Sequence, residues 1–118
     1  MRLEEINRKV CTDLRYVPMS EHLDFLVNLL ELQRDKKFPT ERELANKVLY
    51  KFLKLREGTH LSRAKFSYVA GILYLSFYHS KEKLTLHEIE TLSEVTLPSI
   101  TYGWREVILE LFKEMVKA

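Results

Sequence analysis

The sequence is poor in the residues that build disulfide frameworks and loop-rich folds. It has one cysteine, Cys11, which excludes an intrachain disulfide and a zinc site built from cysteines. Three glycines and three prolines are too few for an all-β fold, which needs a turn about every 8–12 residues. A single glutamine and three asparagines beside many lysines and glutamates are typical of heat-adapted proteins. We therefore expect a thermophilic source.

Long hydrophobic runs are also missing. The longest apolar stretch, residues 68–78, is interrupted by Gly71 and Ser76 and is far shorter than the roughly 20 residues that span a bilayer. The chain begins Met-Arg-Leu-Glu-Glu, with acidic residues where a signal peptide would become apolar. We expect a cytoplasmic protein, nucleoid-associated if it binds DNA, without a membrane partner.

Residue patterns that carry catalysis or bind metals are scarce. Two acidic pairs, Glu41 with Glu43 and Glu88 with Glu90, are two residues apart and would point to different sides of a helix. No glycine-rich phosphate loop occurs, and no histidine has a partner at metal-ligand spacing. The four histidines lie in separate segments: His22, His60, His79 and His87. We expect no enzyme, no metal, no cofactor and no small-molecule substrate.

What the chain has, from end to end, is helical periodicity, which predicts an all-α fold of about six helices. A first amphipathic segment ends at Pro18, and we assign residues 1–19 to an N-terminal helix and residues 20–118 to the main domain. Ser20 is the expected N-cap of the next helix. The apolar positions of these two helices are Leu3, Ile6, Val10 and Leu14, then Leu23, Leu26, Val27 and Leu30.

Two further helices follow. Thr40 and Glu43 have capping-box spacing and predict the start of a helix that ends near Gly58. Its predicted buried positions are Leu44, Val48, Leu49, Phe52 and Leu53. Ser62 is the expected cap of a helix that is apolar on nearly all sides, so this helix should lie in the middle of the bundle. Gly71 would let a neighbouring helix approach it closely.

The last part of the chain has the spacing of a helix-turn-helix. A capping box of Thr85 and Glu88 predicts a short helix from Leu86 to about Glu94, and Thr96 is the expected cap of the final helix. Tyr74 and Trp104 are expected in the core, whereas the sequence does not decide whether Tyr102 is buried or exposed. The predicted buried side of the final helix is Ile100, Trp104, Val107, Ile108, Leu111, Phe112 and Met115.

Charge is unevenly distributed along the chain. The net charge is only +2, but residues 34–65 hold ten Lys or Arg against four Asp or Glu, a net charge of +6. Within this block Lys47, Lys51 and Lys54 share one helix face, and Arg63 and Lys65 follow. Such a basic cluster attracts nucleic acid, an acidic protein or anionic lipid.

Residues 66–111 resemble a cyclin-like repeat of transcription factor IIB, especially the second repeat of the archaeal proteins. The matching features are a central helix ending in Leu73-Tyr74, a loop at residues 81–83, and Thr85 leading into Glu88-Ile89. Val95-Thr96, Ser99-Ile100 and Arg105-Glu106 then follow without a gap. Phe38-Pro39 and a helix with Ala45 and Tyr50 extend the resemblance more loosely, to about residues 20–115.

The resemblance implies a five-helix cyclin fold, with residues 1–19 as an extra helix and the last two helices as a helix-turn-helix. In the family this unit contacts promoter DNA beside the TATA-binding protein, and its second helix reads the major groove. The positions carried over as contacts are Thr96, Ser99, Thr101, Tyr102, Gly103 and Arg105. The family usually has arginine where this chain has Thr101 and Gly103, which weakens base reading. Cys11 alone cannot build the family's zinc ribbon.

Two functions remain open from the sequence. The first is a transcription-associated module that contacts duplex DNA through the basic residues Lys47, Lys51, Lys54, Arg63 and Lys65 and through the helix-turn-helix. The second is a docking module of cyclin fold that binds an acidic component of the transcription machinery, such as the TATA-binding protein or a polymerase subunit, without reading DNA.

Overall fold

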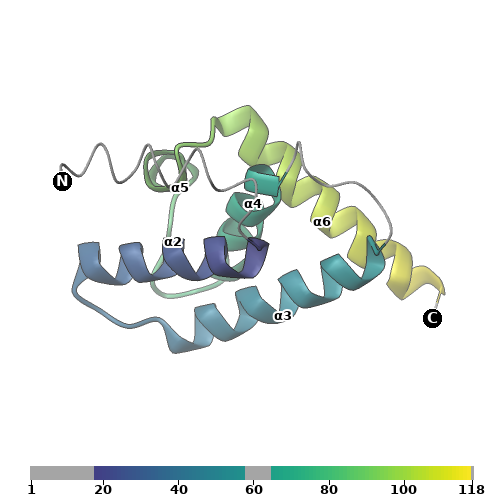
Figure 1. Cartoon of the computed structure of the whole chain (residues 1–118), viewed down its shortest axis with the longest axis horizontal. Helices are drawn as coiled ribbons and strands as arrows, with labels where there is room; N and C mark the ends of the chain where they lie inside the picture. The colour runs from purple at the N-terminus through teal and green to yellow at the C-terminus, as the bar shows by residue number, and fades with distance from the viewer. Residues whose placement is uncertain (1–17, 58–64, 118) are drawn as a thin grey trace.

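The computed structural model describes residues 18–57 and 65–117, and these residues form five α-helices without a strand. In Figure 1, α2 (Met19–Arg34) and α3 (Pro39–Leu55) lie side by side and run in opposite directions. Helix α4 (Lys65–Phe77) lies between this pair and the last two helices, α5 (Leu86–Ser93) and α6 (Leu97–Lys117). The predicted all-α fold is therefore confirmed, while the N-terminal helix predicted for residues 1–19 lies almost entirely outside the described residues.

Helix α4 is the centre of the bundle, as its all-round apolar pattern predicts. It contacts each of the other four described helices, and every residue from Tyr68 to Leu73 is buried. Gly71 itself faces α6, where a Cβ atom would overlap the backbone nitrogen of Trp104. Gly103 meets α4 in the same way, since a Cβ there would overlap the carbonyl oxygen of Ser67. Two glycines thus allow the backbones of α4 and α6 to touch.

Helix α3 begins earlier than the sequence predicts. Pro39 is its first residue, because the fixed φ of proline suits a first helical turn and its missing N–H needs no acceptor. The prediction of a capping box between Thr40 and Glu43 is wrong, since no side chain of α3 caps the start of this helix. The buried carboxylate of Glu31, on α2, instead accepts a hydrogen bond of 2.7 Å from the N–H of Phe38. The cap comes from a neighbouring helix, which local spacing does not reveal.

Helix α2 also begins before its predicted cap. Its first residue is Met19, and Pro18 stands at the N-cap position without a side-chain hydrogen bond, so Ser20 caps nothing. The predicted core positions of this helix are confirmed: Leu23, Leu26, Val27 and Leu30. On α3, by contrast, Leu44 is exposed and Ala45 is buried in its place. Gly58, the predicted end of α3, and Ser62, the predicted N-cap of α4, lie outside the described residues.

Helices α5 and α6 form the predicted pair with a short turn. Thr85 and Glu88 make both hydrogen bonds of the capping box, and Glu94 ends α5 in the left-handed conformation, with φ of 59°. Ile89 and Ile100 are fully buried between the two helices and α4. The short helix, the turn and the final helix expected from the spacing are therefore present.

The second half of α6 differs from the prediction. Ile100 and Val107 are buried, and Trp104 and Leu111 pack partly against the core. Three residues predicted to be buried are exposed: Ile108, Phe112 and Met115. Ile108 borders a recess between α4 and α6, and the described residues leave all three side chains exposed. None of the described helices has the length and apolar character needed to cross a membrane.

Candidate macromolecular interface

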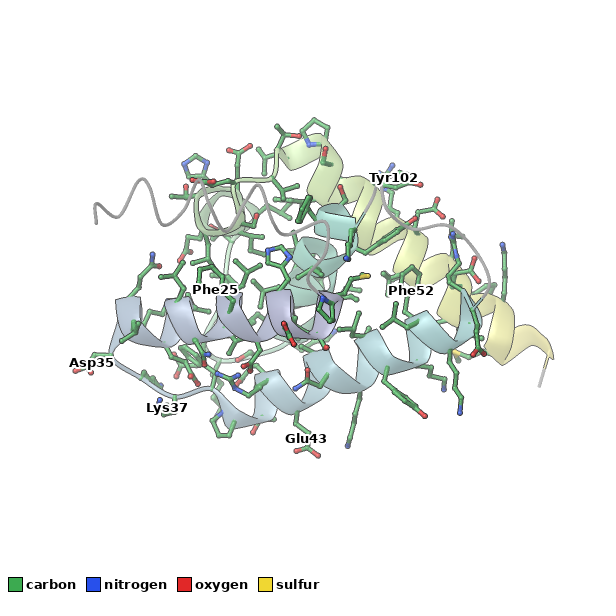
Figure 2. The ribbon with its side chains drawn as sticks, viewed as in Figure 1. Phe25, Asp35, Lys37, Glu43, Phe52 and Tyr102 are labelled. Carbon is green, nitrogen blue, oxygen red and sulfur yellow. The ribbon has the colours of Figure 1, made fainter. Side chains whose placement is uncertain are left out.

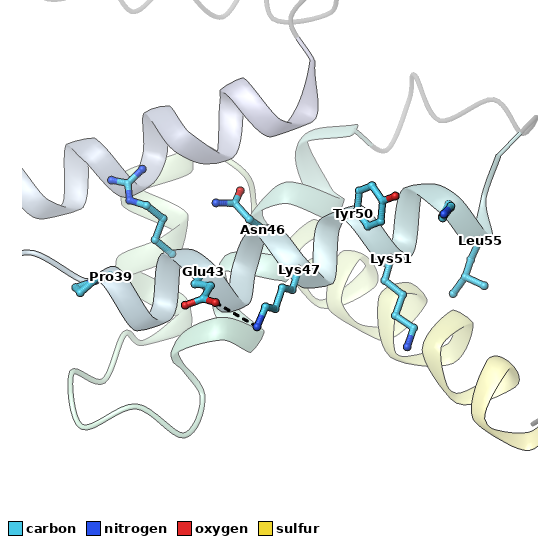
Figure 3. Close-up of a pocket in the computed structure, with 9 residues that line it drawn as sticks. Pro39, Glu43, Asn46, Lys47, Tyr50, Lys51 and Leu55 are labelled. Carbon is cyan, nitrogen blue, oxygen red and sulfur yellow. Dashed lines mark ion pairs between the residues drawn. The ribbon is translucent and has the colours of Figure 1, made fainter.

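The outer face of α3 carries the lysines predicted to point outward. Lys47, Lys51 and Lys54 are all exposed, at spacings of four and three residues that place them on one side of the helix. The predicted pair of Glu43 with Lys47 is present, with 3.2 Å between the carboxylate oxygen and the ammonium nitrogen (Figure 3). The ammonium of Lys54 lies 5.3 Å from the centre of the Tyr50 ring, within range of a cation–π contact.

A shallow hollow of about 860 Å³ follows this face of α3. Tyr50, which is 66% exposed, and Leu55 contribute apolar surface to it. The methylene stems of the lysines add more, because a lysine keeps only its ammonium group in water. Figure 3 shows the residues that line the hollow: Pro39, Arg42, Glu43, Asn46, Lys47, Tyr50, Lys51, Lys54 and Leu55. The surface is therefore apolar within the hollow and cationic at its rim, a combination that the sequence analysis did not predict.

Arg42 at the start of this hollow is held by three acceptors on α2. Its guanidinium is paired with Asp24, donates a hydrogen bond of 2.6 Å to Asn28, and lies 2.8 Å from the carboxylate of Glu31. The hydrogen bond from the Phe38 N–H, followed by that from Arg42, keeps the pKa of Glu31 below its usual value although burial acts against this. Arg42 is thus a structural residue that fixes α3 against α2.

The start of α6 is where the family resemblance places DNA contacts. The N–H of Leu97 donates a hydrogen bond of 2.9 Å to the carboxylate of Glu90, and the Thr96 hydroxyl lies 3.0 Å from that of Ser99. A free helix N-terminus attracts phosphate through its unpaired N–H groups and its dipole. Here a carboxylate of the chain itself occupies that position, so the N-terminus of α6 is a poor phosphate site.

Thr101, Tyr102 and Arg105 line a second surface hollow, of about 680 Å³, further along α6. The Tyr102 ring lies 6.1 Å from that of Tyr68, and burial together with a hydrogen bond from the Tyr68 hydroxyl to Tyr102 raises the pKa of Tyr68 to about 12. The guanidinium of Arg105 lies 5.7 Å from the Trp104 ring. These three predicted contacts are accessible, although Thr101 is only half-exposed.

Gly103 is wrong as a contact position. It is buried against Ser67 of α4, so it faces the core of the bundle and not the outside of α6. An arginine at this position, as in the family, would collide with the α4 backbone. The departure from the family pattern therefore has a packing reason in this chain, independent of nucleic-acid recognition.

The two predicted sets of contacts do not form one surface. Figure 2 shows Glu43, the partner of Lys47, at one edge of the molecule and Tyr102 at the opposite edge. Lys47, which pairs with Glu43, therefore lies on a different side of the molecule from Tyr102. Lys65 begins α4 and is half-buried near His22, whereas Arg63 lies outside the described residues.

The surface of α5 is acidic and already paired. The carboxylate of Glu88 lies 2.5 Å from the guanidinium of Arg34, and this hydrogen bond is the main reason that the pKa of Glu88 is lowered. Arg34 also donates to the carbonyl oxygen of Lys83, at 3.1 Å, which holds the turn before α5.

In residues 18–57 and 65–117 no three His, Cys, Asp or Glu side chains are placed to share a metal ion.

No protein-family model matches the sequence, and neither the curated proteins nor the solved structures contain a match to this chain.

Proposed function

We propose that this chain is a protein-docking module that binds an acidic segment of a partner protein along the outer face of α3. The observation that carries the proposal is the row of Lys47, Lys51 and Lys54 over an apolar hollow. A surface with both characters suits an acidic amphipathic helix or strand. Carboxylates would meet the ammonium groups at the rim, and apolar side chains would displace water from the hollow around Tyr50 and Leu55.

The resemblance to a cyclin-like repeat of transcription factor IIB supports the same proposal. Cyclin folds often act as docking platforms, and the five helices of the described residues, the last two joined by a short turn, are compatible with that fold. On this basis the partner is a component of the transcription machinery, such as the TATA-binding protein or a polymerase subunit. The proposal includes a cyclin-like arrangement of the helices, with residues 1–19 as an additional helix.

Duplex DNA is the second candidate partner, and one observation favours it: three ammonium groups lie in a row on one helix face. The start of α6 argues against reading bases, because Glu90 occupies its N-terminus and Gly103 is buried. Contacts from α3 alone would neutralise about three phosphates, and log affinity would then fall with log salt at a slope of about −2.7. Binding of this kind would be weak and independent of DNA sequence.

Two probes separate these candidates on the full chain. One is a synthetic acidic amphipathic peptide, compared with a scrambled peptide of the same composition. The other is a labelled DNA duplex titrated across a salt series. The decisive variants are Tyr50→Ala, which removes apolar surface without changing charge, and Lys54→Glu, with Leu32→Ala and Lys81→Glu as exposed controls on other elements.

For a docking module we expect both Tyr50→Ala and Lys54→Glu to weaken peptide binding by about tenfold or more, because each removes part of the contact. The two controls should leave binding unchanged, and the scrambled peptide should bind less tightly. DNA binding that is lost in Lys54→Glu but intact in Tyr50→Ala would select the DNA candidate. Equal binding of both peptides would contradict docking in the hollow.

A further inference from the structure

One exposed side of α6 carries an apolar surface that is separate from the hollow on α3. Ile108, Phe112 and Met115 follow one another at steps of four and three residues, which keeps them within a narrow stripe about 10 Å long. They are 42%, 59% and 74% exposed. Steps of this kind are typical of helices that pair with another helix.

Beside this stripe, α4 and α6 enclose a recess of about 430 Å³. Its origin is the contact at Gly71 and Gly103, because two helices that touch at a crossing point diverge on either side of it. The Tyr74 ring lies 6.0 Å from Trp104 on one side and 5.8 Å from Tyr78 on the other. The recess is lined by Tyr74, Leu75, Tyr78, His79, Trp104 and Ile108.

The recess and the stripe form one continuous surface, because Ile108 belongs to both. We propose that this surface binds a second copy of the same chain, with the α6 helices antiparallel across a two-fold axis near Ile108. Phe112 and Trp104 lie four residues on either side of that axis. The exposed Phe112 of each copy is thereby placed at the aromatic recess of the other, as a self-complementary interface requires.

The size of the surface agrees with a dimer contact. Tyr78, which is 57% exposed, joins the three stripe residues. At about 200 Å² for a fully exposed side chain of this size, the four expose roughly 450 Å² of mostly apolar area. A standard interface buries about 800 Å² per partner, of which roughly 60% is apolar. An exposed apolar patch of several hundred Å² often marks a functional contact surface.

Sedimentation equilibrium of the full chain over a wide concentration range tests the proposal. We expect a monomer–dimer equilibrium, with a dissociation constant raised at least about tenfold in Phe112→Glu. Leu32→Glu is the matched control, since Leu32 is exposed on α2 and should leave the equilibrium unchanged. Circular dichroism should show the same helix content in both variants, because both side chains are exposed. A wild-type chain that stays monomeric, or a dimer unaffected by Phe112→Glu, would overturn the proposal.

Disulfide trapping tests the two-fold geometry separately. In a Cys11→Ser background, Ile108→Cys should form a covalent dimer on mild oxidation, because position 108 lies at the axis and meets its own copy. Leu32→Cys should remain monomeric. Oligomers beyond the dimer, or equal cross-linking at both positions, would contradict the antiparallel arrangement. The peptide-binding assay on α3 should be unchanged in Phe112→Glu, so failure of the dimer and failure of the docking function are distinguishable.

Discussion

A neutral histidine lies in the core where α2 meets α4. The His22 side chain is only 4% exposed and its ring stands edge-on to Phe66, with 5.4 Å between the ring centres. Among the described residues its Nδ1 atom has no hydrogen-bond partner. Burial, and to a smaller extent the charge of Lys65, lowers the pKa of His22 from 6.5 to about 4. Protonation of this ring is therefore unfavourable in the folded state.

Stability should consequently fall as pH drops from about 6.5 to 4. Over this interval the unfolded chain binds a proton at His22 and the folded chain does not, so acid favours unfolding by at most about 3 kcal/mol. Urea denaturation at several pH values measures the effect. His22→Leu, which is similar in size and cannot titrate, should remove most of the dependence in this interval. An unchanged slope in His22→Leu would assign the acid sensitivity to other groups.

Among the elements, the starts of α3 and α5 look alike in sequence and differ in structure. Both have threonine followed three residues later by glutamate. Thr85 and Glu88 make the capping box, whereas Thr40 lies inside the first turn of α3 behind Pro39. The difference arises because Glu31 on α2 already satisfies the N–H of Phe38. Spacing along the chain contains no information about that neighbouring carboxylate.

The two threonines should therefore respond differently to the same substitution. Thr85→Ala should lower the free energy of unfolding by about 1 kcal/mol, because it removes the acceptor for the Glu88 N–H. Thr40→Ala should change it by less than about 0.5 kcal/mol, since Thr40 is exposed and caps nothing. Chemical denaturation of the two variants side by side measures this. Equal losses would show that both helices depend on their threonine.

The positions of the helices were predictable from the sequence because they depend on local periodicity. The burial of individual side chains was predictable only where the apolar face of a helix packs against the core. Leu23 and Leu30 repeat on the face of α2 that meets the core, and both are buried. On α6 the same kind of pattern predicts Phe112 and Met115 to be buried, but both are exposed. The candidate site was predictable as a row of lysines on α3. Its hollow was not, since that depends on how Tyr50 and the lysine stems lie together.

At the scale of the whole molecule, Arg56 connects the end of α3 to α6. Its guanidinium lies 2.8 Å from the carboxylate of Glu106 and 2.9 Å from that of Glu110, and it stacks within 5.5 Å of the Phe52 ring centre. Both carboxylates are partly buried, so each depends on this cation more than a surface partner would. Local spacing does not predict these two ion pairs, because Arg56 and its partners are about fifty positions apart in the chain.

Arg56→Ala should lower the free energy of unfolding by about 2 kcal/mol, because it leaves two neighbouring carboxylates without their shared cation. Arg56→Lys should recover only part of the loss, since one ammonium cannot replace the two-point contact. Lys81→Ala, at an exposed position in the turn, serves as the neutral control. Thermal and urea denaturation measure all three variants. A loss below about 0.5 kcal/mol in Arg56→Ala would mean that the α3–α6 contact depends on apolar packing alone.

The touching backbones of α4 and α6 have a consequence for the covalent chain between them. Gly71 and Gly103 bring the two helices together, so the turn after α4 and the whole of α5 form a loop that is closed at its base. Arg34 on α2 also donates hydrogen bonds to that turn, at the carbonyl oxygens of Glu82 and Lys83. A single proteolytic cut between Ser80 and Lys83 should therefore leave two fragments that stay associated and separate only when the bundle is denatured.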